Sequence, residues 1–116
     1  MEPVIKVGNL DARRDLSDVR DVVRAYAALM QSGTSGVVYN VASGVARSIQ
    51  SILDALISRS RVPVRVEVDQ DRMRPNDVPV IVGDASRLTA ATGWQPAISF
   101  DQTLEDLLAY WRNQTT

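Results

Sequence analysis

Residues 9–26 read NLDARRDLSDVRDVVRAY, and this stretch places a short charged segment directly before a helix. Residues 11–16 form either a charged connector or a second short strand. Asp18, or Ser17 beside it, is a suitable N-cap because its side-chain oxygen can accept a hydrogen bond from an amide of the first helical turn. Apolar residues then recur at the three- and four-residue spacing of an amphipathic helix. They predict a buried stripe made of Val19, Val22, Val23, Tyr26 and Met30.

Short strands are expected on both sides of this helix. Residues 3–10 precede it and are rich in valine and isoleucine, whereas Gly33 and Gly36 follow and end it. Residues 37–41 (VVYNV) are almost continuously apolar, which is the pattern of a strand covered on both faces. Alternating valines and a short apolar run predict two further strands, at residues 64–68 and 80–82.

Three more helices follow from caps and apolar spacing. Ser48 caps a helix whose apolar residues lie on one face, and Asp84 opens a short helix that holds Leu88. The last helix begins with Ser99 and Gln102 as a capping-box pair. Its expected buried stripe consists of Phe100, Leu104, Leu107, Leu108 and Trp111.

The predicted order is strand, helix, strand, helix, strand, loop, helix, helix. Short strands that alternate with helices around one core are typical of an α/β fold. The chain has 116 residues and shows no composition shift, internal repeat or low-complexity segment, so we expect residues 1–116 to form a single domain.

Composition excludes several classes of function. Hydrophobic residues make up 45% and charged residues 23% of the chain, which is the balance of a soluble globular protein. The formal net charge of -1 argues against a nucleic-acid partner held by bulk charge. Apolar runs are too short to span a membrane and no leader opens the chain, so we expect a cytoplasmic location. Cys and His are absent, which excludes thiolate catalysis, His-based catalysis and most metal sites.

The chain also lacks the motifs of cofactor binding and catalysis. There is no G-x-G-x-x-G turn between a strand and a helix and no Walker A loop. None of Tyr26, Tyr39 and Tyr110 is followed four positions later by Lys. We therefore expect no metal, no cofactor and no catalytic residue in this chain, and no turnover of a substrate by the chain alone.

Arginines in loops are the remaining candidates for ligand-binding residues. Arg13-Arg14-Asp15 lies before a helix, and residues 72–77 read RMRPND in an irregular segment. A guanidinium suits phosphate oxygens, and Asp77 could accept hydrogen bonds from ribose hydroxyls while Arg74 meets the phosphates. The alternative is that Arg74 and Asp77 only pair with each other or with solvent, a contribution of about 0–1 kcal/mol when exposed.

Five stretches in order resemble a known family. The segment R-D-x-x-x-V-x-D-V at residues 14–22 resembles that of extended short-chain dehydrogenases/reductases, and most of all the enzymes that act on GDP-hexoses: GDP-mannose 4,6-dehydratases and GDP-4-dehydro-6-deoxymannose reductases. The other stretches are VYNVASG at 38–44, RPNDVP at 74–79, GDASRL with TGWQP between 83 and 96, and LLAYWR at 107–112. The resemblance extends from Val4 to Arg112.

The resemblance implies the C-terminal, nucleotide-sugar-binding portion of such an enzyme. It assigns Arg14 and Arg74 to the diphosphate of a GDP-sugar and Asp77 to the ribose. The N-terminal dinucleotide-binding domain, with its glycine-rich turn and Tyr-x-x-x-Lys pair, has no counterpart in these residues. NAD(P) is implied for a full-length relative only. Trp94 and Trp111 are expected in or at the edge of the core.

Two alternatives stay open at this point. The chain could be a free-standing, non-catalytic domain that binds nucleotides or assembles with another chain, for instance as one half of a split enzyme. It could also be an anion-binding module of unrelated biology. Because the strand at 37–41 expects neighbours that this chain lacks, an unpaired edge predicts a dimer or larger assembly.

Overall fold

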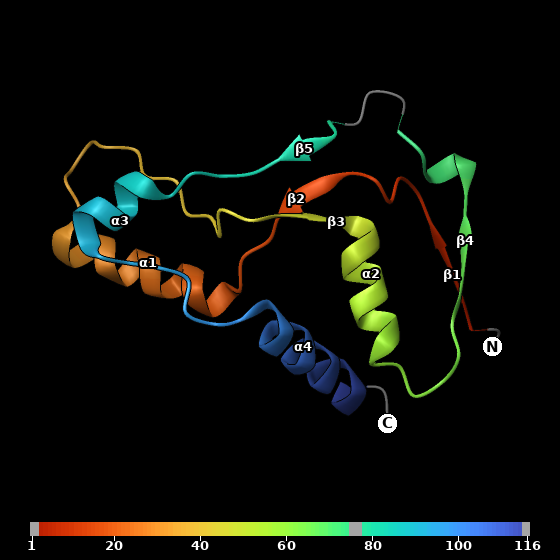
Figure 1. The fold of residues 1–116 in the computed structure, drawn as a ribbon. Coiled ribbons are helices and arrows are strands. Elements are labelled where there is room, and N and C mark those ends of the chain that lie inside the picture. The colour runs from red at the N-terminus through yellow and green to blue at the C-terminus, as the bar shows by residue number, and fades with distance from the viewer. Residues whose placement is uncertain (1–2, 75–77, 115–116) are drawn as a thin grey trace. The chain divides into compact units, whose positions relative to one another are not determined.

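The computed structural model describes residues 3–74 and 78–114 (Figure 1). The chain divides into two compact units. Unit 1 consists of Met1–Arg14 and Ala46–Ile81, and unit 2 of Asp15–Val45 and Val82–Thr116. Each unit therefore combines segments that lie far apart in the sequence.

A two-stranded parallel sheet forms one part of unit 1. Strands β1 (Val4–Val7) and β4 (Arg65–Val68) lie side by side, with Val4 opposite Arg65 and Val7 opposite Val68 (Figure 1). The strand predicted over residues 3–10 thus exists but ends before Gly8. The β4 strand is followed directly by a 3-10 turn, η1 (Gln70–Arg72).

A second, three-stranded sheet has the order β3-β2-β5 and comprises β3 (Ala46–Ser48), β2 (Arg13–Asp15) and β5 (Val80–Ile81). Strand β2 runs parallel to β5, with Arg13 opposite Val80 and Arg14 opposite Ile81. Of the two possibilities for residues 11–16, the short strand is therefore the one observed. Strand β3 was not predicted, and it leads without a break into α2 (Ile49–Ser58).

Helix α2 begins where the sequence predicted. The Ser48 hydroxyl oxygen accepts a hydrogen bond of 3.1 Å from the Ser51 amide. The amides of Ile49 and Gln50 donate to the carbonyl oxygens of Ala12 and Leu10, both at 2.9 Å. The free amides of the first turn are thus satisfied by a side-chain cap and by the segment before β2.

Unit 2 is built from α1 (Val19–Ser32), α3 (Ser86–Thr92) and α4 (Phe100–Gln114). Its buried cluster consists of Ala25, Leu88 and Trp94, and α3 ends at Gly93, whose φ of 77° suits glycine. The prediction that Trp94 belongs to the core is confirmed. Partly buried apolar residues pack around the cluster: Leu29, Tyr39, Val41 and Ala85.

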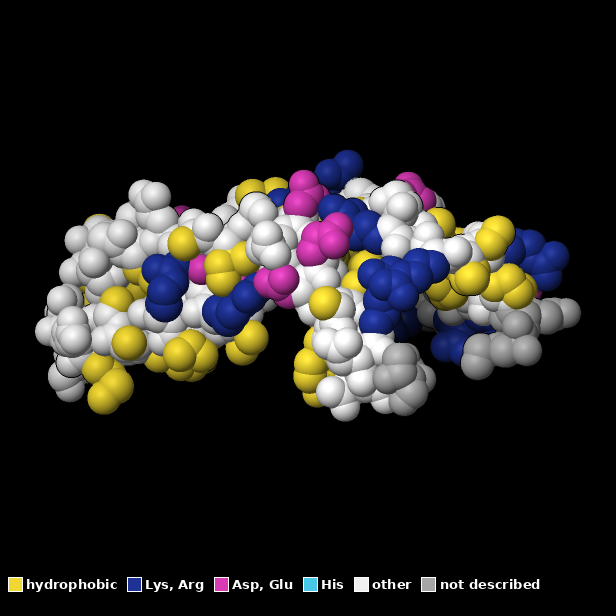
Figure 2. Space-filling view, turned by 90° about the horizontal axis from the view of Figure 1, so that it is seen from below, with side chains coloured by type: hydrophobic (Ala, Val, Ile, Leu, Met, Phe, Trp, Pro, Cys, Tyr) yellow, Lys and Arg dark blue, Asp and Glu magenta, His cyan; other side chains and the backbone are white. Residues whose placement is uncertain are grey.

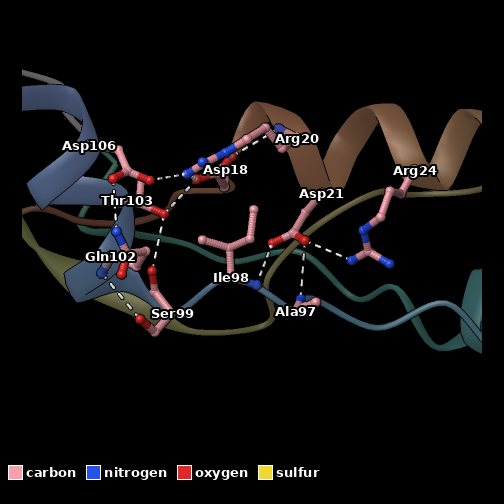
Figure 3. A network of polar contacts seen from close by, with 10 residues as sticks. All are labelled: Asp18, Arg20, Asp21, Arg24, Ala97, Ile98, Ser99, Gln102, Thr103 and Asp106. Carbon is pink, nitrogen blue, oxygen red and sulfur yellow. Dashed lines mark hydrogen bonds and ion pairs between the residues drawn. The ribbon is translucent and has the colours of Figure 1, made fainter. Parts of the chain in front are cut away.

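Two buried carboxylates connect α1 to the segment around α4 (Figure 3). Asp18 caps α1 by accepting from the Arg20 amide at 2.8 Å, and it also accepts from the Thr103 hydroxyl at 2.7 Å. Asp21 accepts from the amides of Ala97 at 3.1 Å and Ile98 at 3.3 Å. The cap role expected for Asp18 is confirmed, and Asp21 holds the segment before α4.

The buried stripe predicted for α1 is wrong at four of its five positions, and only Val22 is partly buried. Val19, Val23, Tyr26 and Met30 are exposed, Met30 at 90% of its side-chain surface, and hydrophobic side chains are visible at the surface over this helix in Figure 2. The helix instead buries the face of Asp21 and Ala25, because the hydrogen bonds of Asp21 and the packing of Ala25 hold that face against Trp94 and α3. Spacing alone could not choose between two adjacent faces.

The strand predicted at residues 37–41 is also wrong. These residues form no regular structure, and Val38 is 74% exposed. A strand requires a neighbour to pair its amides and carbonyls. Within residues 3–74 and 78–114, the two sheets contain β1 to β5 and none of their strands pairs with this stretch.

Helix α4 keeps half of its predicted cap. Ser99 Oγ accepts from the Gln102 amide at 3.1 Å, but the Gln102 side chain donates to Asp106 instead of returning to Ser99. Leu104 is buried as expected. Leu107 and Trp111 are exposed, Trp111 at 57% with its ring edge-on to Tyr110, so Trp111 does not lie in the core itself.

The predicted α/β class is confirmed, with short strands and helices in both the sequence order and the structure. None of the helices in the described part of the chain combines the length and the apolar character needed to cross a membrane.

Candidate functional site

Arg14 lies in the middle of β2, and its guanidinium is held in place by main-chain oxygens. Its Nη1 donates to the carbonyl oxygens of Arg13 and Val78, both at 2.8 Å. The side chain is half-buried. Two hydrogen bonds from one nitrogen restrict the rotamer, so this arginine presents its charge from a fixed position.

Arg74 follows the η1 turn in the same unit. The Asp69 carboxylate caps the turn by accepting from the Asp71 amide at 3.0 Å and pairs with Arg72 Nε at 3.5 Å. Met73 then leaves the turn in an extended conformation, and Arg74 comes next with an exposed side chain.

Arg14 contacts the chain shortly after Arg74. Val78, which accepts the hydrogen bond from Arg14, stands four residues after Arg74. Four residues of extended chain reach at most about 14 Å, so the Arg74 backbone lies within that distance of the Val78 backbone.

Asp77, the third predicted residue, lies outside the residues that the structure describes. Its role at a ribose and the alternative of a simple pair with Arg74 both stay predictions.

Unit 1 carries a small excess of positive charge. Nine of the thirteen Lys and Arg residues and seven of the fourteen Asp and Glu residues fall within its two sequence ranges, which gives a formal charge of +2, although the chain as a whole carries a net charge of -1. An excess of this sign is compatible with an anionic ligand.

Asp15, the neighbour of Arg14, has a structural role that was not predicted from the sequence. Its carboxylate accepts four hydrogen bonds: from the Ser43 amide and hydroxyl at 2.9 and 2.6 Å, from the Gly44 amide at 2.8 Å and from the Gly83 amide at 3.1 Å. Burial alone would raise the pKa of Asp15, but these hydrogen bonds outweigh it and lower the pKa below its ordinary value. Asp15 thus holds two loops of unit 2 together. A carboxylate after two arginines gives no sequence signal for this role.

In the described part of the chain, the starts of α1 and α2 do not fit the pyrophosphate of a dinucleotide cofactor. Such a cofactor places its pyrophosphate on free amides at a helix N-terminus. The first amides of α2 are already bonded to Ala12, Leu10 and Ser48, and the start of α1 is occupied by the Asp18 carboxylate. Among the described residues, no group of three acidic side chains is placed to hold a metal ion either.

Comparison with known proteins identifies related sequences. A family model described as GDP-mannose 4,6 dehydratase matches residues 1–107. The GDP-6-deoxy-D-mannose reductase of Pseudomonas aeruginosa is 36% identical over 110 residues, and the human GDP-mannose 4,6 dehydratase is 25% identical over 120 residues. The matches cover 95% and 88% of this chain but only 36% and 32% of those relatives. The chain thus spans about a third of their length.

Solved structures agree on the fold. The protein RMD from Pseudomonas aeruginosa, solved in complex with NADPH, matches with a TM-score of 0.92 and 34% identity over 99% of this chain and 38% of that chain. UDP-glucose 4-epimerase from Thermotoga maritima, solved with UDP-glucose, matches with a TM-score of 0.79 at 24% identity over 99% of this chain and 36% of that chain, which is a likeness of fold.

Proposed function

The chain belongs to the GDP-mannose 4,6 dehydratase family, and from this premise we propose that it forms the GDP-hexose-binding portion of a dehydratase or 4-keto reductase of that family. In this proposal Arg14 and Arg74 bind the diphosphate and Asp77 binds the ribose. These residues hold and orient the nucleotide-sugar, and the chain is not catalytic alone. Positioning of this kind contributes to catalysis only when a reactive group is supplied from elsewhere.

One observation carries the proposal. The Arg14 guanidinium is bonded to the carbonyl oxygen of Val78, at the end of the short segment that begins with Arg74. A nucleoside diphosphate carries two adjacent anionic groups, which match two arginines on neighbouring segments. The two relatives compared by sequence are named after GDP-sugars, namely GDP-6-deoxy-D-mannose and GDP-mannose. These names agree with a GDP-hexose as the ligand.

Full-length members of the family are expected to bind NAD(P), and the structure of RMD contains NADPH. At the starts of α1 and α2, the described residues offer no free amides for its pyrophosphate. Hydride transfer would be the chemistry that the bound cofactor supplies.

A second candidate function is assembly with another chain, either a separate half of a split enzyme or a second copy. The exposed apolar residues of α1 favour it, because Val19, Val23 and Tyr26 are each more than half exposed.

We further propose, as expected from composition, that the two units act as one domain and that the protein is cytoplasmic.

Calorimetric titration with GDP and GDP-mannose tests the leading proposal. The parent should bind both ligands, and the double variant Arg14→Ala/Arg74→Ala should lose most of the affinity. Arg61→Ala provides a single-charge control, because Arg61 is an exposed arginine of unit 1 that belongs to neither β2 nor η1. Absence of binding by the folded parent would reject the proposal.

A further inference from the structure

We propose that Gly8 is a positioning residue for Arg74, because the missing side chain at position 8 allows the η1 turn to close onto the end of β1. The inference rests on the proposed function, in that it explains how the second diphosphate-binding arginine is held in place. Gly8 itself touches no ligand in this account.

The first observation is the continuation of hydrogen bonding beyond β4. The β1–β4 ladder ends at the pair Val7 and Val68, yet the next residue, Asp69, donates its amide to the Val7 carbonyl oxygen at 2.8 Å. The chain therefore enters η1 while it is still attached to the last residue of β1. This attachment fixes where the turn starts.

The second observation is the close approach at the other end of the turn. A Cβ built on Gly8 would overlap the carbonyl oxygen of Arg72 and lie 3.0 Å from its carbonyl carbon and 3.3 Å from its Cβ. The nearest atoms belong to backbone, which cannot swing aside as the end of a flexible side chain can. Any residue other than glycine would push the turn away from β1.

The turn itself is tightly bonded, so a displacement at Arg72 would be transmitted and not absorbed. The Arg72 amide donates to the Asp69 carbonyl oxygen at 2.9 Å, and the Met73 amide donates to that of Gln70 at 3.1 Å. Arg74 stands only two residues after the carbonyl that faces Gly8. A shift of the turn therefore moves the origin of the Arg74 side chain.

Gly8 also stands at the point where the two arginine segments separate. Residues 9–13 connect Gly8 to Arg14. The Arg72 carbonyl, which lies against Gly8, is two residues before Arg74. A side chain at this point would change the spacing of the two cations. The spacing decides whether both can reach one diphosphate.

A double-mutant cycle tests this inference. GDP affinity is measured by calorimetry for the parent, Gly8→Ala, Arg74→Ala and the double variant. If Gly8 acts through Arg74, Gly8→Ala weakens GDP binding by about tenfold in the parent and by less than about twofold when Arg74 is already absent. A folded Gly8→Ala variant with the parent's affinity would overturn the inference, and so would an equal loss in both backgrounds.

A matched control separates positioning from general destabilisation. Gly36 has a φ of 82°, and a Cβ there would meet nothing within 4 Å, so Gly36→Ala strains the backbone of unit 2 without a clash. It should leave GDP affinity unchanged. If Gly8→Ala does not fold, Asp69→Ala loosens the same turn without adding a side chain at position 8. That variant should show the same dependence on Arg74, and parent-like affinity would contradict the inference.

Amide hydrogen exchange provides a readout that does not depend on GDP. The amides of Arg72 and Met73 are hydrogen-bonded within η1, and in Gly8→Ala they should exchange about tenfold faster than in the parent or in Gly36→Ala. If the parent fails to bind GDP, the proposed function is rejected while this measurement still decides the role of Gly8. Unchanged exchange in Gly8→Ala would reject that role.

Discussion

The indole nitrogen of Trp94 donates a buried hydrogen bond of 2.9 Å to the main-chain carbonyl oxygen of Asp21. Trp94 is only 5% exposed and belongs to the core cluster of unit 2, while Asp21 lies in the first turn of α1. One residue pair thus couples apolar packing to a polar contact at the start of the helix. The same Asp21 holds the segment before α4 through its carboxylate.

Trp94→Phe should destabilise the protein by about 1–3 kcal/mol, because it removes the indole donor and leaves a smaller ring in the core. Chemical denaturation followed by circular dichroism measures the free energy of unfolding. Trp111→Phe is the matched control, since Trp111 is 57% exposed, and it should change stability by less than about 0.5 kcal/mol. Equal effects of the two substitutions would contradict the assignment of the core.

Asp21→Ala should destabilise the protein by about 2–3 kcal/mol. The substitution leaves the amides of Ala97 and Ile98 without their acceptor in a partly buried place. Asp54→Ala provides the comparison, because Asp54 is an exposed helical carboxylate whose side chain accepts only from Gln50 among the hydrogen bonds described for it. Thermal unfolding of both variants measures the difference. A loss for Asp21→Ala no larger than that for Asp54→Ala would show that the carboxylate is dispensable.

Acid should weaken unit 2 through Asp18. The guanidinium of Arg20 donates to the Asp18 carboxylate at 2.9 and 2.8 Å and, with the Thr103 hydroxyl, holds the pKa of Asp18 far below its ordinary value despite burial. A carboxyl group with a lowered pKa in the folded state stabilises that state at a pH above the ordinary value of about 3.9. The stabilisation is lost as the pH falls through that value toward the lowered pKa.

Thermal unfolding of the parent and of Asp18→Asn at several pH values between about 7 and 3 tests this assignment. The parent should be the more stable protein at neutral pH, and its advantage should shrink as the pH falls below about 4. An advantage that stays constant over the whole range would mean that Asp18 does not contribute through its charge.

Local signals in the sequence were sufficient for much of the fold. Asp18, Ser48 and Ser99 all cap helices as predicted, because a cap depends on residues within one turn of each other. The core position of Trp94 and the strand β1 also follow from local apolar character.

The failures concern contacts between distant segments. The predicted stripe of α1 has the right spacing but the wrong face, because the helix is oriented by Asp21 and its bonds to residues 97 and 98. The apolar run at 37–41 lacks a partner strand in the described chain and forms none. At the candidate site, Arg14 could be singled out, whereas its bond to Val78 and the closure of η1 over Gly8 depend on the tertiary fold.

Self-association, predicted from the unpaired apolar run, stays to be tested. Val38 and Met30 are exposed apolar residues that a second chain could cover. Size-exclusion chromatography with light scattering over a concentration series should show a dimer or larger species. Elution at the monomer mass throughout the series would contradict this prediction. Met30→Lys places a charge on the exposed side of α1, and it should lower the fraction of dimer if that helix takes part in the contact.

The central claim is that two arginines hold the diphosphate of a GDP-sugar, and calorimetry with GDP and with guanosine tests it most directly. The parent should bind GDP at least about tenfold more tightly than guanosine, which lacks the diphosphate. Arg14→Ala/Arg74→Ala should lower the affinity for GDP to that for guanosine and leave guanosine binding unchanged. Equal binding of the two ligands by the parent, or parent-like GDP binding by the folded double variant, would contradict the account.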